Sequence, residues 1–168
     1  MMTYNLLCDK FFDSRAKHLS ADDACRSMDY RLKQILAEIR QNLPDVLCLQ
    51  EVSVRSAGPT LLRELDALGY EVTHNEYFNK KSDLGHWSRR ALNNNHRFWC
   101  VLTAVRRCRF SIVCSRVINY YDISYYQYHK VHNSRKQNKG NVVLLVDRHN
   151  AANKLIVANT QLYRGKFD

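Results

Sequence analysis

The stretch that decides the fold is DVLCLQEV, residues 45–52. It holds an unbroken apolar run at 46–49, which is typical of a strand that is buried on both faces. Gln50 and Glu51 follow this run directly. We therefore expect a central strand that delivers the Glu51 carboxylate to one edge of a sheet.

The sequence upstream of this strand predicts a strand and then a helix. Residues 3–7 are β-prone, and Asn5 lies in or just after that run. An S-x-x-D capping signal stands at 20–23, and apolar residues then recur at helical spacing over 28–43. Pro44 is expected to stop the helix. The first part of the chain thus reads as strand, helix, strand.

Downstream, the pattern predicts one more helix and several strands. Gly58 and Pro59 open a helix that Gly69 is placed to end in the left-handed conformation. Strand patterns follow at residues 71–78, 99–105, 110–117, 141–147 and 155–160. The second and third of these are expected to form a hairpin through a short cationic turn. Strands and helices that alternate, followed by strands only, predict an α/β or α+β layered sheet.

The bulk composition is that of one globular domain. The chain has 168 residues, 45% of them apolar, with only 5 Gly and 2 Pro. No apolar run approaches the roughly 20 residues of a membrane span. The six cysteines lack the C-x-x-C spacing of a zinc site and most lie in apolar runs. We expect reduced thiols, a cytoplasmic or nuclear location and no membrane association.

The positive charge is concentrated in the middle of the chain. The net charge is +10, and residues 80–140 carry 13 Lys and Arg against two acids. Aromatic residues are interleaved there, a mixture that suits phosphate attraction and base stacking. We expect RNA to be bound there, with these residues as candidate contacts: Arg106, Arg107, Arg109, Lys136 and Lys139. A solvated basic loop beside ordinary strand aromatics remains the alternative interpretation.

Asn5 and Glu51 are the candidates for chemistry. A phosphoesterase built around Mg²⁺ needs hard oxygen ligands and few of them, because that ion keeps most of its waters. Glu51 could anchor the ion, and the Asn5 amide could orient a ligand water or a phosphate oxygen. Taken from the residues alone, a solvated glutamate and a turn-forming asparagine remain an open alternative.

Two of these segments, taken together, resemble the endonuclease/exonuclease/phosphatase superfamily. They are TYNLLCD at residues 3–9 and DVLCLQEV at 45–52. Shorter matches follow in the family's order at residues 29–31, 68–70, 138–142 and 157–160. The resemblance is to the branch of CCR4-type, nocturnin-like and Angel-like deadenylases, and it spans nearly the whole chain.

The resemblance implies a fold and a site. The expected fold is DNase I-like, a two-sheet β-sandwich flanked by helices, of which this chain would supply the N-terminal half. Glu51 would be a ligand to Mg²⁺ or Mn²⁺, Asn5 would lie in the shell of the metal and the phosphate, and Asn159 would line the active site. Gln161 stands where the family has a histidine, and a glutamine cannot carry a proton there.

The end of the chain is a second departure from the family's pattern. The sequence ends in GKFD at 165–168, before the place of the family's Gly-Asp-Phe-Asn and Ser-Asp-His motifs. We therefore expect residues 1–168 to be a single, truncated domain without a complete catalytic set. The inner face of its one sheet would then lie uncovered, which predicts a protein partner or self-association.

Three functions follow from these observations. The first is a Mg²⁺-dependent phosphodiesterase that acts on RNA, most like a 3′-5′ poly(A) exoribonuclease, although incomplete as given. The second is a catalytically inactive fragment that binds RNA or a protein partner through residues 80–140. The third is a phosphatase of nucleotides or other small phosphoesters, since this fold does not choose among substrates.

Overall fold

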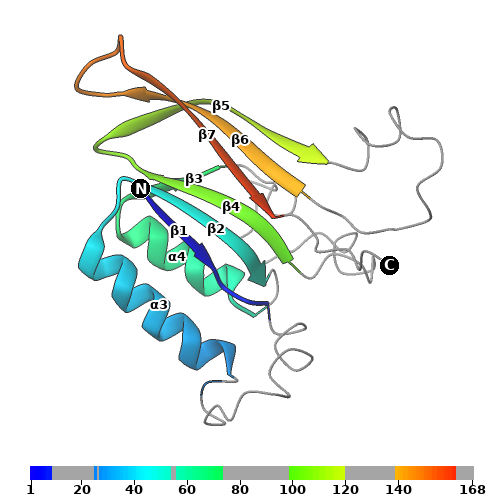
Figure 1. Ribbon diagram of the computed structural model, residues 1–168. Helices are drawn as coiled ribbons and strands as arrows, with labels where there is room; N and C mark the ends of the chain where they lie inside the picture. The colour runs from blue at the N-terminus through cyan, green and yellow to red at the C-terminus, as the bar shows by residue number, and fades with distance from the viewer. Residues whose placement is uncertain (9–24, 26, 54–55, 74–98, 120–138, 162–168) are drawn as a thin grey trace, which may run out of the picture.

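In the part of the chain that the structure describes, the fold is a sandwich of two β-sheets with two helices on one outer face (Figure 1). A computed structural model describes residues 1–8, 25, 27–53, 56–73, 99–119 and 139–161. The first sheet has the strand order β1-β2-β4-β3, and the second has the order β5-β6-β7. In chain order, the elements are β1 Met2–Asn5, α3 Met28–Asn42, β2 Val46–Ser53, α4 Gly58–Ala67, β3 Tyr70–Val72, β4 Trp99–Arg106, β5 Phe110–Asn119, β6 Lys139–Asp147 and β7 Lys154–Gln161.

The two helices form because each presents an apolar stripe to the first sheet. In α3 the buried side chains recur at a spacing of three and four residues. Helix α3 ends at Leu43, which has a left-handed φ of 37° ahead of Pro44. The chain turns after α4 at Gly69, whose φ of 81° favours a residue without Cβ. Both ends fall where the sequence predicted them.

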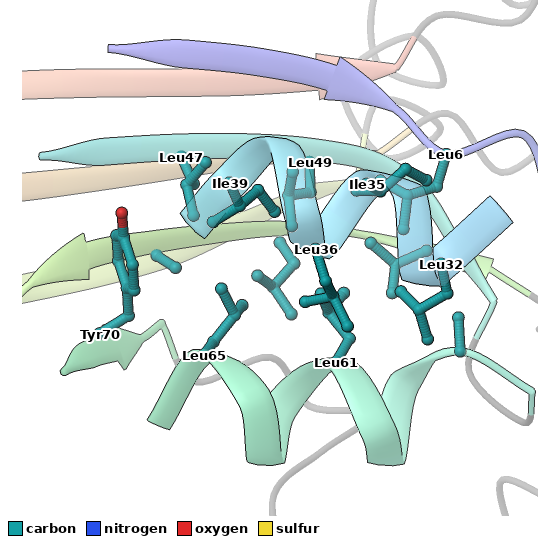
Figure 2. Close-up of a cluster of buried hydrophobic side chains, with 14 of the residues drawn as sticks. Leu6, Leu32, Ile35, Leu36, Ile39, Leu47, Leu49, Leu61, Leu65 and Tyr70 are labelled. Carbon is teal, nitrogen blue, oxygen red and sulfur yellow. The ribbon is translucent and has the colours of Figure 1, made fainter. Parts of the chain in front are cut away.

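The larger core lies between these helices and the first sheet (Figure 2). β2 contributes Leu47 and Leu49, and β4 contributes Leu102, all three with no exposed surface. The helices contribute a set of large side chains that are at most 4% exposed: Leu32, Ile35, Leu36, Ile39, Leu61 and Leu65. Burial of this apolar surface, about 25 cal/mol for each Å², holds the helices on the sheet.

A smaller core lies between the two sheets. Val46, Cys48 and Val105 of the first sheet pack against Val143, Leu145 and Val157 of the second. The expectation of a single sheet with an uncovered inner face is therefore wrong, because β5, β6 and β7 leave the first sheet and cover that face. The structure therefore gives no support for the protein partner that was predicted to cover the inner face of the first sheet. Large apolar side chains stay exposed instead on the second sheet, at Val113 and Ile156.

Strands β4 and β5 form where expected, but the hairpin predicted between them is wrong. β4 pairs with β2 on one side and β3 on the other, while β5 pairs with β6 in the second sheet. Both edges of β4 are taken, and its six middle residues are buried. The turn after β4, in which the Arg109 N–H donates to the Arg106 carbonyl at 3.0 Å, carries the chain from one layer to the other.

Several expectations fall outside the described residues. These are the capping signal at 20–23, the continuation of β3 over 74–78, Lys136 and most of the basic segment. Within the described part of the chain, no helix is both long and apolar enough to span a bilayer. All six cysteines are free thiols, and burial raises the pKa of Cys48 and of Cys100.

Candidate functional site

Three polar side chains from three strands meet at one end of the sandwich. β1 and β2 are parallel neighbours in which Asn5 pairs with Gln50, and β7 approaches from the other sheet. The Asn5 amide Nδ2 donates to Glu51 Oε1 at 3.3 Å and to Gln161 Oε1 at 3.4 Å. Gln161 Nε2 donates to Glu51 Oε1 at 3.0 Å. The fold thus gathers side chains that are as far as 156 positions apart in the sequence.

A β-bulge in β2 aims Glu51 into this site. Leu49 pairs with Leu102 but Val52 pairs with Cys100, so two residues of β2 oppose one of β4. Strict alternation after Leu47 and Leu49 would place residue 51 in the core against the helices. Val52 takes that place instead, and Glu51 has a left-handed φ of 52°. Glu51 was expected at the exit of the strand. It lies within β2, which continues to Ser53.

Amide groups surround the Glu51 carboxylate. The residue is 1% exposed, and besides the two side-chain amides the backbone N–H of Cys8 donates to Glu51 Oε2 at 3.3 Å. Hydrogen bonds of this kind offset part of the cost of taking a charge out of water. Asn5 Oδ1 in turn accepts from the Leu7 N–H at 2.9 Å. The carboxylate is therefore held in one orientation from both sides.

The Asn159 side chain forms hydrogen bonds with backbone groups near this site. Its Nδ2 donates to the carbonyls of Leu49 at 3.2 Å and Leu102 at 2.9 Å, the pair next to the bulge. Its Oδ1 accepts from Gln50 Nε2 at 2.7 Å. Asn159 is 2% exposed, so its amide ties the second sheet to the first. The prediction that it lines an active site stays a prediction, while its place beside the bulge is an observed feature.

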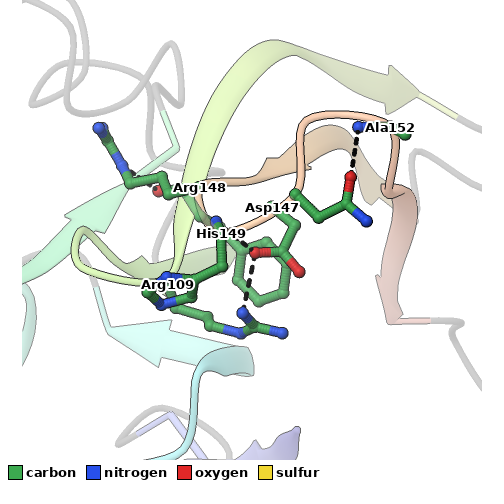
Figure 3. A network of polar contacts seen from close by, with 7 residues as sticks. Arg109, Asp147, Arg148, His149 and Ala152 are labelled. Carbon is green, nitrogen blue, oxygen red and sulfur yellow. Dashed lines mark hydrogen bonds and ion pairs between the residues drawn. The ribbon is translucent and has the colours of Figure 1, made fainter.

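The structure separates the predicted arginine contacts from Asn5 and Glu51. Val105, just before Arg106, pairs with Val46 at the start of β2. At about 3.3 Å per residue this point lies roughly 17 Å along the strand from Glu51. Arg107 forms an ion pair with Asp66, and Arg109 forms one with Asp147 at 2.8 Å (Figure 3).

Among the predicted RNA contacts that the structure describes, Lys139 is the exception. Its backbone pairs in register with Gln161, at the end of the sandwich that carries the candidate site. The four predicted contacts in the described ranges therefore divide into an arginine cluster at the far end and one lysine position near the site. RNA contact by either group stays a prediction.

The donor set fits a hard divalent cation that keeps several of its waters. Glu51 supplies a carboxylate, against which Asn5 and Gln161 place their amide nitrogens. The two amide oxygens accept from the Leu7 N–H and from Asn5 Nδ2, so either would have to exchange that bond for an ion. Mg²⁺ is commonly held through one or two carboxylates, and Mn²⁺ accepts the same oxygen ligands. No group of three His, Cys, Asp or Glu residues comes together within the ranges described above.

Sequence reasoning missed two groups at this site. The Gln50 amide bonds Thr3, Cys48 and Asn159, and its position within the Leu-Gln-Glu word could have drawn attention to it. The Cys8 N–H had no comparable signal, because a backbone donor is present at every residue except proline. Only the path of the chain makes that donor functional.

The fold and the site define the class of protein. A two-sheet sandwich with helices outside is the architecture that the resemblance implied. Asn5 of β1 and Glu51 of β2 lie side by side in it, while their role stays a prediction. The model of the endonuclease/exonuclease/phosphatase family matches residues 2–161, and the chain belongs to this family. Enzymes of the family generally depend on divalent metal ions.

Individual relatives cover the chain to different extents. Over 74 residues, 44% of this chain, it is 36% identical to the CCR4-Not complex 3′-5′-exoribonuclease subunit Ccr4 of Neurospora crassa. The structure is similar to that of ANGEL2, a 2′,3′-cyclic phosphatase, with a TM-score of 0.69 and 23% identity over 96% of this chain. It is also similar to the catalytic domain of human nocturnin, with a TM-score of 0.60 and 21% identity over 98%.

These relatives are all longer proteins. The match covers 9% of Ccr4, 40% of the ANGEL2 chain and 49% of the nocturnin chain. At the identities of the two solved structures, the likeness establishes the DNase I-like fold alone. The expectation that the chain is a truncated domain stays a prediction.

Proposed function

We propose that Asn5, Glu51 and Gln161 form the metal and phosphate site of a phosphodiesterase that acts on RNA, most like a 3′-5′ poly(A) exoribonuclease. The observation that carries this proposal is the convergence of β1, β2 and β7 on one buried carboxylate. In this reaction, water adds to the phosphorus of the terminal phosphodiester, the bond from phosphorus to the 3′ oxygen breaks, and a nucleoside 5′-monophosphate leaves.

Each residue has a definite task in this proposal. Glu51 is the anionic ligand of Mg²⁺ or Mn²⁺, which when bound polarises the phosphoryl group. Asn5 keeps the carboxylate oriented and offers an amide to a phosphate oxygen. Gln161 donates to the same carboxylate oxygen through a neutral amide that does not itself titrate.

RNA is the substrate class that the remaining observations favour. Residues 80–140 carry all the excess positive charge, and the stretch of 36% identity is to an exoribonuclease. Backbone phosphates would be contacted by the predicted residues: Arg106, Arg107, Arg109, Lys136 and Lys139. A cytoplasmic or nuclear location agrees with an RNA substrate and is part of the proposal.

The test is turnover of a labelled oligoadenylate by the whole chain, with Mg²⁺ and with EDTA. Glu51→Gln should lower the rate by more than about 100-fold, because loss of even an outer-shell partner of a metal costs 10- to 100-fold. Glu38→Gln makes the same chemical change on the exposed surface of α3 and should leave the rate unchanged. Turnover that survives either Glu51→Gln or EDTA would contradict the assigned site.

The alternative is an RNA-binding protein without turnover. It is favoured by the single carboxylate that the described residues offer a metal. Retention of labelled RNA that weakens steeply with salt, with no product formed in Mg²⁺ or Mn²⁺, would support it over the nuclease. Release of phosphate from adenosine 2′,3′-cyclic phosphate in the same assay would identify a small-phosphoester phosphatase instead.

A further inference from the structure

The turn that follows β1 carries two of the groups that hold Glu51. Asn5 donates to Glu51 Oε1 at 3.3 Å, and the Cys8 N–H donates to Glu51 Oε2 at 3.3 Å. Between them Leu7 has a φ of 54°, a left-handed conformation that is disfavoured for a residue with a branched side chain. Other contacts must hold this turn, because a change of the Leu7 backbone to a more favourable φ would redirect the Asn5 amide and the Cys8 N–H.

Arg31, in the first turn of α3, makes the contacts that do this. One guanidinium nitrogen, Nη1, donates to the Leu6 carbonyl at 2.6 Å and to the Leu7 carbonyl at 2.8 Å. The side chain is half-buried and reaches from the helix layer to the end of β1. A guanidinium stays charged at every pH that a protein tolerates, so these bonds to neutral carbonyls do not titrate.

The geometry of the peptide unit links Arg31 to Glu51. In a trans peptide the C=O and the following N–H point in opposite directions, and the unit is planar. The Leu7 carbonyl and the Cys8 N–H belong to one such unit. When Arg31 holds the Leu7 carbonyl, the Cys8 N–H is therefore turned away from the guanidinium and toward the Glu51 carboxylate.

We propose that Arg31 is a positioning residue of the candidate site, which fixes residues 5–8 so that Asn5 and the Cys8 N–H address Glu51. This inference rests on the proposed function in that Glu51 is taken as the metal ligand. Arg31 does not touch the metal or the substrate in this proposal. It acts through two peptide planes, and its loss should loosen the carboxylate while the apolar stripe of α3 keeps the helix in place.

The test compares three variants of the whole chain. Arg31→Met removes the donors at similar length, and Arg31→Lys keeps the charge but not the planar fork. Arg40→Met is the matched control, because Arg40 lies in the same helix and makes only a surface ion pair with Glu64 among the contacts described. The measurements are the Mn²⁺ dissociation constant by electron paramagnetic resonance and the exchange rate of the Cys8 amide by NMR, both below the unfolding temperature of each variant.

Arg31→Met should raise the Mn²⁺ dissociation constant and the Cys8 exchange rate by at least about 10-fold each. Arg31→Lys should lie between Arg31→Met and the natural protein, and Arg40→Met should match the natural protein. A purely structural role would lower the unfolding temperature and leave both quantities unchanged below it. That outcome would overturn the inference, and Arg31→Lys decides the matter should Arg31→Met not fold.

Glu51→Gln separates the failure of this inference from the failure of the proposed function. If Glu51→Gln loses Mn²⁺ and Arg31→Met does not, the metal site stands and the role of Arg31 is wrong. If Glu51→Gln binds Mn²⁺ as the natural protein does, the metal site is wrong. The exchange rate of the Cys8 amide, whose measurement needs no metal, then tests on its own whether Arg31 holds the turn.

Discussion

The two ends of the sandwich each hold a buried carboxylate, and they hold it in different ways. At one end Glu51 receives amide N–H groups from Asn5, Gln161 and Cys8, and its own backbone is left-handed. At the other end Asp147 accepts from the Arg109 guanidinium at 2.8 Å and from the His149 N–H at 2.9 Å (Figure 3). The bonds of Asp147 connect the β4–β5 turn, which joins the two layers, with the β6–β7 turn, which lies within the second sheet.

The difference indicates what each end is for. A guanidinium neutralises a carboxylate and fixes it, which suits a structural clasp between the β4–β5 and β6–β7 turns. The amide donors from Asn5, Gln161 and Cys8 orient the Glu51 carboxylate, which suits a ligand for a cation. A backbone conformation that costs free energy is found at the Glu51 end, where proteins tend to keep such strain for function.

The largest effect that would break this comparison is expected at Asn159. Asn159→Ala leaves the Leu49 and Leu102 carbonyls without their amide donor inside the protein, and it should lower the free energy of unfolding by about 2–4 kcal/mol. Urea denaturation measures this. Asn150→Ala is the matched change in the exposed turn of the other end and should cost about 0.5 kcal/mol. Equal losses would show that the bulge does not depend on Asn159.

Metal binding should sharpen the comparison with an effect of similar size. At Mg²⁺ or Mn²⁺ concentrations about 100 times the dissociation constant, the ion should raise the free energy of unfolding by about 2.7 kcal/mol. Asp147→Asn should keep this gain, because Asp147 lies at the far end, and Glu51→Gln should lose it. Calorimetric unfolding with and without the ion measures both. If Asp147→Asn loses the metal-dependent gain in stability and Glu51→Gln keeps it, the metal binds at the Asp147 end and the proposed site is wrong.

Acid should weaken the Asp147 end. The His149 backbone N–H, helped by the Arg109 charge, lowers the pKa of Asp147 in the folded protein. Its contribution is therefore present above the unfolded pKa of an aspartate and is lost as the pH falls through the lower folded value. Unfolding measured from neutral pH down into that acid range should show a steeper loss of stability for the natural protein than for Asp147→Asn. If stability falls with pH equally in the natural protein and in Asp147→Asn, Asp147 does not contribute to acid sensitivity.

The smallest effect on stability is expected from Arg107, whose ion pair with Asp66 is exposed to solvent. Arg107→Ala should cost about 0.2–1 kcal/mol by urea denaturation. If Arg107 contacts RNA phosphate, the same change should reduce the slope of log affinity against log salt by about 1. An unchanged slope would confine RNA binding to other parts of the chain.

Much of the fold was predictable because its elements carry local signals. The helices over 28–42 and 58–67 and the strands at both ends of the described chain lie close to where periodicity placed them. Pro44 and Gly69 marked the helix ends through the backbone alone. The hairpin of β4 and β5 was predicted wrongly, since a short turn between two strands has the same local sequence whether the strands pair or change layers.

Part of the candidate site was predictable in the same local sense. Glu51 and Asn5 follow or end apolar runs in the sequence, and the segments around them carry the family resemblance. These two positions could therefore be predicted from the sequence. The bulge came from the structure, because it depends on β4 and on an asparagine about 110 residues away. The tie from Arg31 to the turn after β1 is likewise a contact between elements.

The sequence by itself determined the family, the two helices, the strands and the identity of the central carboxylate. Those follow from residue type and short-range spacing. The tertiary structure alone decided that β5 to β7 cover the first sheet, that Val52 replaces Glu51 in the core, and that Gln161 reaches the carboxylate. The physical reason is that pairing and packing depend on which surfaces remain free once other elements are in place, and that information is spread over the whole chain.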